Sequence, residues 1–217
     1  MLGQPGTVLI VAPHSDDETI GAFGLIGTLR RAGVRVRVIV VSDGAASHPG
    51  SVRWPRERLI CARVLETRRA MRRAGLHAGA IEYLGLPDGA LTGLGSRGWR
   101  PLARAVRRRR GRGPLLIVGP SPDEAHADHV GVAHALARIP AGRARRLAYC
   151  VWPSQSARPS GRACGLAVAG GAPMKRSVLG VYRTQTGAIS DSPTGFAMSR
   201  AQRARFSRPL ERFEAAR

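Results

Sequence analysis

The stretch TVLIVAPHSDDE, residues 7–18, decides the fold. Its first half, residues 7–12, is apolar and rich in β-branched side chains, which predicts a strand buried on both faces. A helical pattern follows from about Asp17 to Ala32, and a second apolar run covers residues 34–41. A crossover of this length joins parallel strands. The sequence therefore predicts an α/β fold around a mostly parallel sheet.

Apolar and helical patterns continue to alternate along the rest of the chain. This alternation predicts a Rossmann-like three-layer sandwich with helices on both faces of the sheet. A single domain over residues 1–217 is expected, because this length and a hydrophobic content of 43% fit one core. Further helices are expected near 56–74, 98–110 and 128–138, and further strands near 81–84, 115–118 and 147–151.

The C-terminal part of the chain carries weaker patterns. Residues 153–173 are rich in Ser, Pro, Gly and Ala, and one short strand is expected there at 166–169. Pro193-Thr194-Gly195 is another loop signal, and both segments are expected on the substrate side of the fold. Residues 186–217 are expected to form a loop and then a basic surface helix over 200–217. Three apolar side chains, spaced four and three apart, would lie on one face of that helix: Phe206, Leu210 and Phe213.

Composition also bears on the compartment. The start of the chain lacks the pattern of a secretory signal, and no apolar run reaches the roughly 18 residues of a membrane span. We therefore expect a cytoplasmic protein without a membrane span. Three cysteines, an odd number without CxxC spacing, are expected to be buried, reduced thiols: Cys61, Cys150 and Cys164.

The net charge of +21 comes almost entirely from arginine, since Lys175 is the single lysine among 35 basic residues. Arginines occur in nearly every segment, with the densest run at 107–110, and few aromatic residues lie among them. We therefore expect no specific nucleic-acid partner. Nonspecific binding to polyanions is expected at low salt and should fade as salt rises.

The 14 acidic residues are more informative, because six of them lie in two short windows. Three of the six histidines lie in the same windows. One window follows the strand predicted at 7–12 and the other follows the strand predicted at 115–118. Both therefore lie at the carboxyl edge of the sheet, where open α/β folds bind ligands. The acidic residues are Asp16, Asp17, Glu18, Asp123, Glu124 and Asp128, and the histidines are His14, His126 and His129.

Each window also has a simpler explanation. Acidic residues in a first helical turn complement the helix dipole, and Ser15 or Asp16 would serve as the N-cap. Capping does not call for a histidine, however, so His14 argues against this explanation. The second window would otherwise be a solvated polar loop, but His126 and His129 lie three apart at a helix start, so that one could bind a metal while the other faces a substrate. Two histidines without acidic neighbours are assigned no role: His77 and His134.

Two histidines and one carboxylate suit catalytic zinc, which keeps a coordination position open for water. A second carboxylate beside the ligand could take a proton from that water. The adjacent pair Asp16 and Asp17 could therefore divide into a base and a ligand. Metal-assisted hydrolysis is the reaction class that these residues imply.

At this point the motifs resemble a known family. The stretch PHSDDETIG, residues 13–21, resembles the Pro/Ala-His-Pro-Asp-Asp-Glu signature of the PIG-L/LmbE-like zinc-dependent de-N-acetylases, and HADH, residues 126–129, resembles their His-Pro-Asp-His motif. The resemblance extends over about residues 7–185. It includes Ser42-Asp43-Gly44, Arg63 with Glu66, Leu86-Pro87-Asp88-Gly89, Lys175, and Tyr182-Arg183-Thr184-Gln185.

The resemblance implies a metal centre and a base. His14, Asp17 and His129 match the ligands of Zn²⁺ in this family, and other divalent metals suit the same ligands. Asp16 matches the general base that deprotonates the metal-activated water.

The resemblance implies roles for further side chains. His126 would stabilise the oxyanion or protonate the leaving amine, and Asp128 would hold His126 in the useful tautomer and raise its pKa. Arg63 and Asp88 match positions that contact hydroxyls or charged groups of the substrate. The simpler explanations are a helix pair between Arg63 and Glu66 and a turn residue at Asp88.

The implied activity is removal of an N-acetyl or other N-acyl group from an amino sugar or a sugar-containing conjugate, the expected small-molecule partner. Two other functions stay open: an amidase that cleaves a larger sugar-thiol or lipid conjugate, and a metal-retaining binding protein without turnover. Asp16 favours an enzyme, because a binding protein has no need of a base beside three ligands.

Several positions depart from the family pattern. Ser15 and Ala127 replace the two usual prolines. Glu124 lies where sugar-thiol members of the family have a tyrosine that stabilises the oxyanion, and a carboxylate cannot do this. Tyr182 is a candidate replacement by motif position alone. The single lysine, Lys175, suggests a role that needs a compact ammonium group.

Two other α/β functions fit less well. A dinucleotide-binding domain needs GxGxxG at the first turn, whereas Gly21, Gly24 and Gly27 lie inside the helix, where they fit close packing on the sheet. A serine hydrolase needs a GxSxG elbow, which the sequence lacks. Loops 47–56, 89–98 and 153–173 are expected to shape the pocket, and three tryptophans are expected to serve packing: Trp54, Trp99 and Trp152.

Overall fold

Seven strands form one sheet in the computed structural model, which describes residues 6–108, 113–154 and 163–216. The strand order is β3-β2-β1-β4-β5-β7-β6. The first five strands in this order run parallel, while β7 is antiparallel to both β5 and β6. The predicted α/β class with a mostly parallel sheet is confirmed. The strands are β1 (Thr7–Ala12), β2 (Arg35–Ser42), β3 (Ile81–Leu86), β4 (Leu115–Pro120), β5 (Arg145–Tyr149), β6 (Ala163–Ala167) and β7 (Leu210–Ala215).

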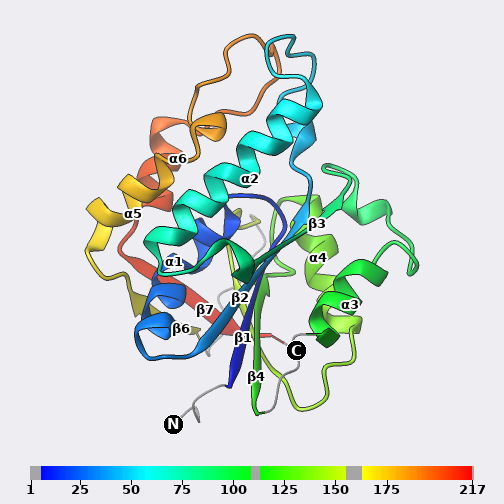
Figure 1. The fold of residues 1–217 in the computed structure, drawn as a ribbon, viewed down its shortest axis with the longest axis vertical. Helices are drawn as coiled ribbons and strands as arrows, with labels where there is room; N and C mark the ends of the chain where they lie inside the picture. Colours follow the sequence, from blue (N-terminus) through cyan, green and yellow to red (C-terminus); the bar gives the residue numbers. More distant parts are fainter. Residues whose placement is uncertain (1–5, 109–112, 155–162, 217) are drawn as a thin grey trace.

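Helices cover both faces of this sheet, so the three-layer arrangement is also confirmed. Figure 1 shows α1, α2, α5 and α6 on one side of the sheet and α3 and α4 on the other. The helix expected over 98–110 begins at Arg100, and its expected end lies outside the described residues. Helix α5 was not predicted. The helices are α1 (Asp17–Arg31), α2 (Arg56–Arg73), α3 (Arg100–Arg108), α4 (Ala127–Arg138), α5 (Gly171–Leu179) and α6 (Arg200–Phe206).

Alternating side chains of the central strand supply two separate cores. All residues of β1 are buried, as the apolar run predicts. Val8 and Ile10 pack with α1, α2 and α5, whereas Leu9 and Val11 pack with α3 and α4. A strand that is apolar on both faces has no favourable place at a sheet edge. This requirement places β1 at the centre and fixes the sheet edge where residues 13–18 emerge.

The helix predicted over residues 200–217 is only partly present. Helix α6 ends at Phe206, and Leu210–Ala215 form strand β7 between β5 and β6. Pro209 cannot continue a helix. The residues beyond it alternate: Leu210 is exposed, whereas Glu211 and Phe213 are buried. The helical spacing of the three apolar residues was therefore misleading, and the proline was the signal that marked the helix end.

Strand β7 is anchored to α1 and α5 by a buried ion pair. The Lys175 ammonium of α5 donates to Oε1 of Glu211 at 2.7 Å, and both side chains are at most 2% exposed. The same carboxylate accepts the backbone N–H groups of Gly24 and Leu25 in α1, at 2.9 and 3.1 Å. Lys175 therefore has a structural role, and its ammonium joins three elements that lie far apart in the sequence.

Two of the three glycines in α1 allow close packing, as the sequence analysis predicted. A Cβ at Gly21 would lie 2.4 Å from the ring of Tyr149, and one at Gly24 would lie 2.9 Å from Val168. At Gly27 the nearest atom is the mobile end of Arg31, at 3.3 Å, so that glycine is not required by a close neighbour.

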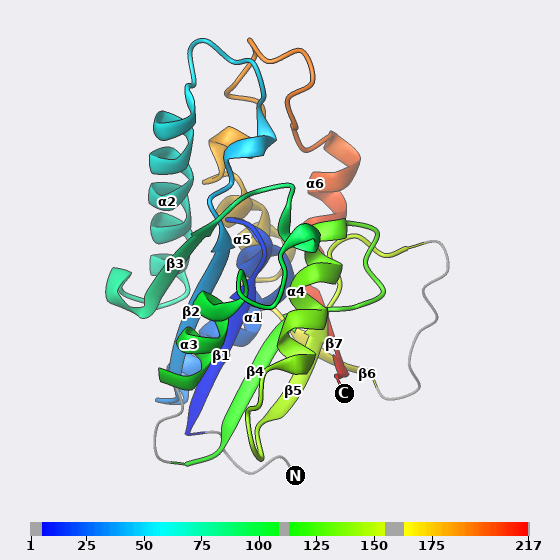
Figure 2. The same ribbon diagram turned by 90° about the vertical axis from the view of Figure 1, so that its right-hand side faces the viewer.

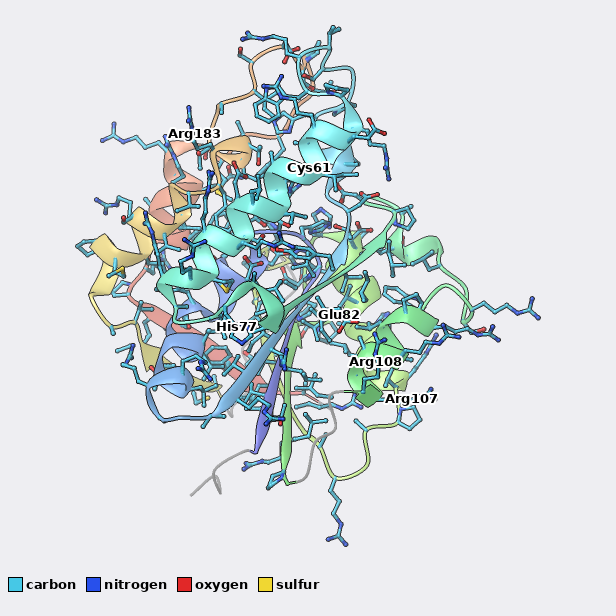
Figure 3. The ribbon with its side chains drawn as sticks, in the orientation of Figure 1. Cys61, His77, Glu82, Arg107, Arg108 and Arg183 are labelled. Carbon is cyan, nitrogen blue, oxygen red and sulfur yellow. The ribbon has the colours of Figure 1, made fainter. Side chains whose placement is uncertain are left out.

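The exposure of the three cysteines differs from the prediction. Cys61, Cys150 and Cys164 are free, as expected, but all three are exposed. Cys61 lies on α2, where Figure 3 shows it among outward-facing side chains. In the same view Arg107 and Arg108 lie on α3 at the opposite side of the molecule from Arg183, so basic side chains occupy separate parts of the surface. No described helix has the length and apolar character to cross a bilayer.

Replacing Lys175 with methionine tests the anchor. Lys175→Met leaves the Glu211 carboxylate buried without its cation, so the free energy of unfolding should fall by about 3–5 kcal/mol. Urea denaturation followed by circular dichroism measures this. Arg176→Met, a matched change at the exposed neighbour, should stay within about 0.5 kcal/mol of the wild type. Equal losses in the two variants would contradict the anchoring role.

Candidate active site

The chain reverses its winding direction between β1 and β4, and the candidate site lies beyond the carboxyl ends of these two strands. The crossover through α1 leads from β1 to β2 on one side, whereas β4 leads to β5 on the other. This is the position where doubly wound sheets open a crevice. A cavity of about 280 Å³ lies there, lined by His14, Asp16, Asp17, Ile20, Ala46, Ser47, Arg63, Asp88, Gly89, His126, Trp152, Gln185, Thr194 and Phe196.

Three buried side chains meet at one carboxylate oxygen. Oδ2 of Asp17 lies 3.2 Å from Nδ1 of His14 and 3.1 Å from Nε2 of His129. One ligand atom from each of the three residues lies within 4.8 Å of the other two, as a shared metal ion requires. The rings of His14 and His129 have centroids 5.3 Å apart. The structure thus brings together the three residues that the sequence analysis predicted as ligands.

The chemistry of this cluster fits a cation. His129 is fully buried and neither of its ring nitrogens has an aligned hydrogen bond, although carboxylate oxygens lie close to both. Asp16, Asp17 and Asp88 line the cavity, and Arg63 is the one arginine among the described residues that do so. Closely spaced buried carboxylates repel one another unless positive charge lies between them. Two imidazoles and a carboxylate are donors that zinc accepts.

The pKa values of the adjacent carboxyl groups of Asp16 and Asp17 are shifted in opposite directions. Burial alone would raise the pKa of Asp17, but the neighbouring imidazoles of His129 and His14 hold it well below its usual range. For Asp16, burial and then the charge of Asp17 raise the pKa well above its usual range. Two carboxyl groups separated in this way suit different tasks, a ligand that stays ionised and a base that takes up a proton.

The backbone of Asp16 is strained. Its φ of 119° lies in the left-handed region that residues with a Cβ rarely adopt. Its N–H donates to Oε2 of Glu18 at 3.1 Å, and its carbonyl accepts from Thr19 and Ile20 as α1 begins. Asp16 therefore occupies the N-cap position without a side-chain capping bond, which leaves its carboxyl group at the cavity. Strain of this kind is common at functional sites.

His126 lies at the exposed side of the cluster, its ring centroid 4.8 Å from that of His14. Its Nδ1 accepts the backbone N–H of Asp128 at 3.2 Å, so in the neutral ring the proton lies on Nε2. Burial and the charges of His14 and His129 lower the pKa of His126, which favours this neutral form. His126 is thereby a hydrogen-bond donor at the cavity.

The carboxylate of Asp128 does not hold His126, contrary to the implied role. It accepts the backbone N–H groups of Gly89 and Leu91, at 2.8 and 2.9 Å, and lies 3.3 Å from Nε2 of His14. Its two oxygens therefore face the loop after β3 and the first histidine. Asp128 supports His14, and the backbone of Asp128 orients His126.

Arg63 and Asp88 line the cavity while bound to the protein itself. The Arg63 guanidinium donates to the carbonyls of Ser15 and Gly44, at 2.8 and 3.1 Å. Asp88 accepts the N–H of Ala46 and lies 3.1 Å from Nε2 of His14. Burial would raise the pKa of Asp88, but this contact lowers it to about 2. The helix pair suggested for Arg63 is not formed, because its suggested partner, Glu66, accepts the N–H and hydroxyl of Thr184.

A comparison with models of known protein families shows which family the chain belongs to. A family model described as GlcNAc-PI de-N-acetylase (PIG-L) matches residues 9–139, more than half of the chain. The chain belongs to the PIG-L family. Comparison with curated proteins finds no match.

Solved structures share the fold of this PIG-L protein at low identity. The N,N'-diacetylchitobiose deacetylase of Pyrococcus horikoshii is 20% identical, with a TM-score of 0.67 over 85% of this chain and 72% of that one. The zinc-inhibited form of a teicoplanin deacetylase is 16% identical, with a TM-score of 0.65 over 95% and 96%. The 4-carboxy-2-hydroxymuconate hydratase of Pseudomonas putida is 18% identical, with a TM-score of 0.63 over 82% and 79%.

Two loops shape the pocket of this PIG-L protein. In Figures 1 and 2 the loop before α2, in cyan, and the loop before α6, in orange, lie side by side beyond the sheet. Ser47 of the first loop and Thr194 of the second line the cavity, and both lie in segments that the sequence places on the substrate side, whereas Phe196 was not predicted. Of the predicted segment 89–98 only Gly89 reaches the cavity, and none of the described residues of 153–173 lines it.

Trp152 also lines the cavity, where its ring packs edge-on against Phe196 and Phe206 with centroids 6.1 and 5.0 Å away. Trp152 therefore has the packing role that was predicted, and it also lines the cavity, which was not predicted. Trp99 packs against the core, as predicted, and Trp54 lies under the guanidinium of Arg58.

Tyr182 is not positioned to replace the oxyanion tyrosine of other PIG-L proteins. It is fully buried, its hydroxyl donates to Oε1 of Glu18, and that hydroxyl lies 2.8 Å from the hydroxyl of Thr19. Tyr182 is absent from the described residues that line the cavity. Burial raises the pKa of Glu18 to about 7 despite this hydrogen bond. Tyr182 therefore serves to satisfy a buried carboxyl group at the start of α1.

The variant Tyr182→Phe distinguishes a structural role, support of the buried Glu18 carboxyl group, from a role in oxyanion stabilisation. Removing the hydroxyl leaves Glu18 buried without this donor, so the free energy of unfolding should fall by about 1–3 kcal/mol. Metal affinity and turnover should be retained in the folded variant. Urea denaturation and metal titration measure the two effects. Tyr83→Phe, which removes a half-buried hydroxyl bonded to a backbone carbonyl, is the control and should cost less. Full stability with lost turnover would contradict this assignment.

Proposed function

We propose that this protein is a metal-dependent hydrolase that removes an N-acetyl or other N-acyl group from an amino sugar or a sugar-containing conjugate. The observation that carries the proposal is the convergence of His14, Asp17 and His129, of which His14 and Asp17 line one cavity together with Asp16. Family membership and the deacetylase activity named for two of the structural neighbours, one of them a diacetylchitobiose deacetylase, support it. The hydratase among the neighbours has the same fold, so the proposal rests on the site.

The metal would be held by His14 through Nδ1 and by His129 through Nε2, because these atoms face Asp17, the third ligand. Zn²⁺ is the ion that this donor set suits best, although other divalent metals accept the same donors. When bound, zinc supplies a Lewis acid that polarises an amide carbonyl and lowers the pKa of water.

The side chains around the centre would carry the proton transfers. Asp16, with its raised pKa, would accept a proton from the attacking water and hold it for the leaving nitrogen. His126 would donate from Nε2 to the carbonyl oxygen as negative charge develops there, or to the leaving amine. Both groups line the cavity.

The cavity dimensions favour a small acyl group on a substrate that extends outside. Its volume of about 280 Å³ lies at the lower end of small-molecule sites. A neighbouring cavity of about 340 Å³ shares Ala46 and Asp88 as walls and is lined by His48 and Trp54. A conjugate could therefore continue from the reacting amide into the second cavity, which keeps an amidase of larger conjugates as the second candidate.

Amine release is the direct test. We expect metal-loaded protein to release a primary amine, detected with fluorescamine, from at least one member of a panel of N-acetyl amino sugars, sugar-inositol conjugates and N-acyl glycolipids. Chelation should abolish release and Zn²⁺ should restore it. Silence across the panel from protein with full metal content would contradict the proposed acylated-sugar substrate class.

Two variants assign the base and a ligand. Asp16→Asn should keep the metal and lower kcat by about 10²–10⁴, and asparagine also tolerates the left-handed backbone at this position. His129→Ala should instead lose the metal. Elemental analysis and amine release measure the two properties separately. Unchanged kcat in the first variant, or full metal content in the second, would contradict the respective role.

A further inference from the structure

Glu124 lies at the position that the resemblance assigns to an oxyanion tyrosine in sugar-thiol members of the family, and it is absent from the described residues that line the cavity. It lies in the loop between β4 and α4, and its side chain is fully buried. Oε1 accepts the backbone N–H of Val151 at 2.7 Å, and Oε2 accepts that of Trp152. The backbone of the same loop pairs with the segment after β5 through Glu124 and Pro153, and through Ala125 and Trp152. Its carboxylate is therefore engaged by the backbone of residues 151–152 and does not line the pocket.

The same carboxylate faces the third predicted metal ligand. Oε1 of Glu124 lies 3.3 Å from Nδ1 of His129, while Nε2 of that ring faces Asp17. An imidazole that binds a metal through Nε2 must carry its proton on Nδ1, and a carboxylate beside Nδ1 stabilises that tautomer. The ring of His129 lies between two buried carboxylates, one on each nitrogen.

His14, the first predicted histidine ligand, also has a carboxylate near each of its ring nitrogens. Nδ1 of His14 faces Asp17, and its Nε2 lies 3.1 Å from Asp88 and 3.3 Å from Asp128. Each histidine thus has one nitrogen toward the shared carboxylate and the other toward a supporting carboxylate. For His129 the described residues supply that support through Glu124.

We propose that Glu124 is a positioning residue that holds His129 in the Nδ1-protonated form and couples the metal centre to the pocket wall at Trp152. The inference rests on the proposed metal site. Oxyanion stabilisation then falls to His126 and the metal.

Zinc affinity of Glu124→Gln is the first test, measured on the full-length protein by competition with a chromophoric chelator. A glutamine side chain has one acceptor oxygen and no charge, so it cannot accept from both backbone N–H groups and also place a negative charge beside His129. The dissociation constant for Zn²⁺ should rise by about 10- to 100-fold. Asp123→Asn is the matched control, because it removes the same charge at the exposed neighbouring position, and its affinity should equal that of the wild type.

The proton on Nδ1 of His129 is the second test. Long-range ¹H–¹⁵N correlation spectra of the zinc-loaded protein, labelled at histidine, should show this proton, assigned by the signal that His129→Asn lacks. The proton should exchange with water faster in zinc-loaded Glu124→Gln than in the wild type, whereas a structural role of Glu124 in the loop alone would leave its exchange rate unchanged.

The outcomes separate the two proposals. Equal zinc affinity in Glu124→Gln and Asp123→Asn, or equal exchange rates of the Nδ1 proton in wild type and Glu124→Gln, would overturn the positioning role and leave the proposed function standing. A wild-type protein that binds no Zn²⁺ would overturn both.

Discussion

Burial of carboxylates at one edge of the sheet is the constraint that the surrounding structure must satisfy. Asp16, Asp17, Glu18, Glu124 and Asp128 are each at most 6% exposed. Removing one charged group from water without giving it a partner costs on the order of several kcal/mol. The chain meets this demand with donors from many elements. They are the backbone N–H groups of Gly89, Leu91, Val151 and Trp152, the hydroxyl of Tyr182, the imidazoles of His14 and His129, and the nearby charge of Arg63.

The sign of charge thus differs between the cavity and the rest of the molecule. The chain as a whole carries +21, with exposed arginines on separate helices, whereas the cavity collects carboxyl groups. A cation is attracted to the cavity by these groups at short range, where water screens least. Polyanions meet the basic exterior instead, and their attraction is screened by salt.

The sequence was sufficient to predict the central architecture and the meeting of the two acidic windows. The apolar runs of β1 and β4 identify buried parallel strands, and parallel strands bring residues 14–18 and 123–129 to the same edge. Hydrogen-bond partners that come from distant segments of the chain could not be predicted from the sequence. The hydroxyl of Tyr182 reaches Glu18 across the fold, and the carboxylate of Asp128 turns to His14 because Gly89 and Leu91 hold it there. Strand β7 was missed because three apolar residues happened to fit a helical spacing.

The pocket has two walls that differ in how freely they can change. Trp152 is joined by its backbone to Glu124, which also faces His129, so alterations of this wall reach a predicted metal ligand. The wall formed by Thr194 and Phe196 is attached to the loop before α2, where Phe196 donates to the carbonyl of Ser47 and Ser51 donates to Asp191. Its described hydrogen bonds do not include a predicted ligand. Diversification of substrate preference among descendants of this chain would therefore proceed most readily through residues 186–198, where a changed shape leaves the reacting groups in place.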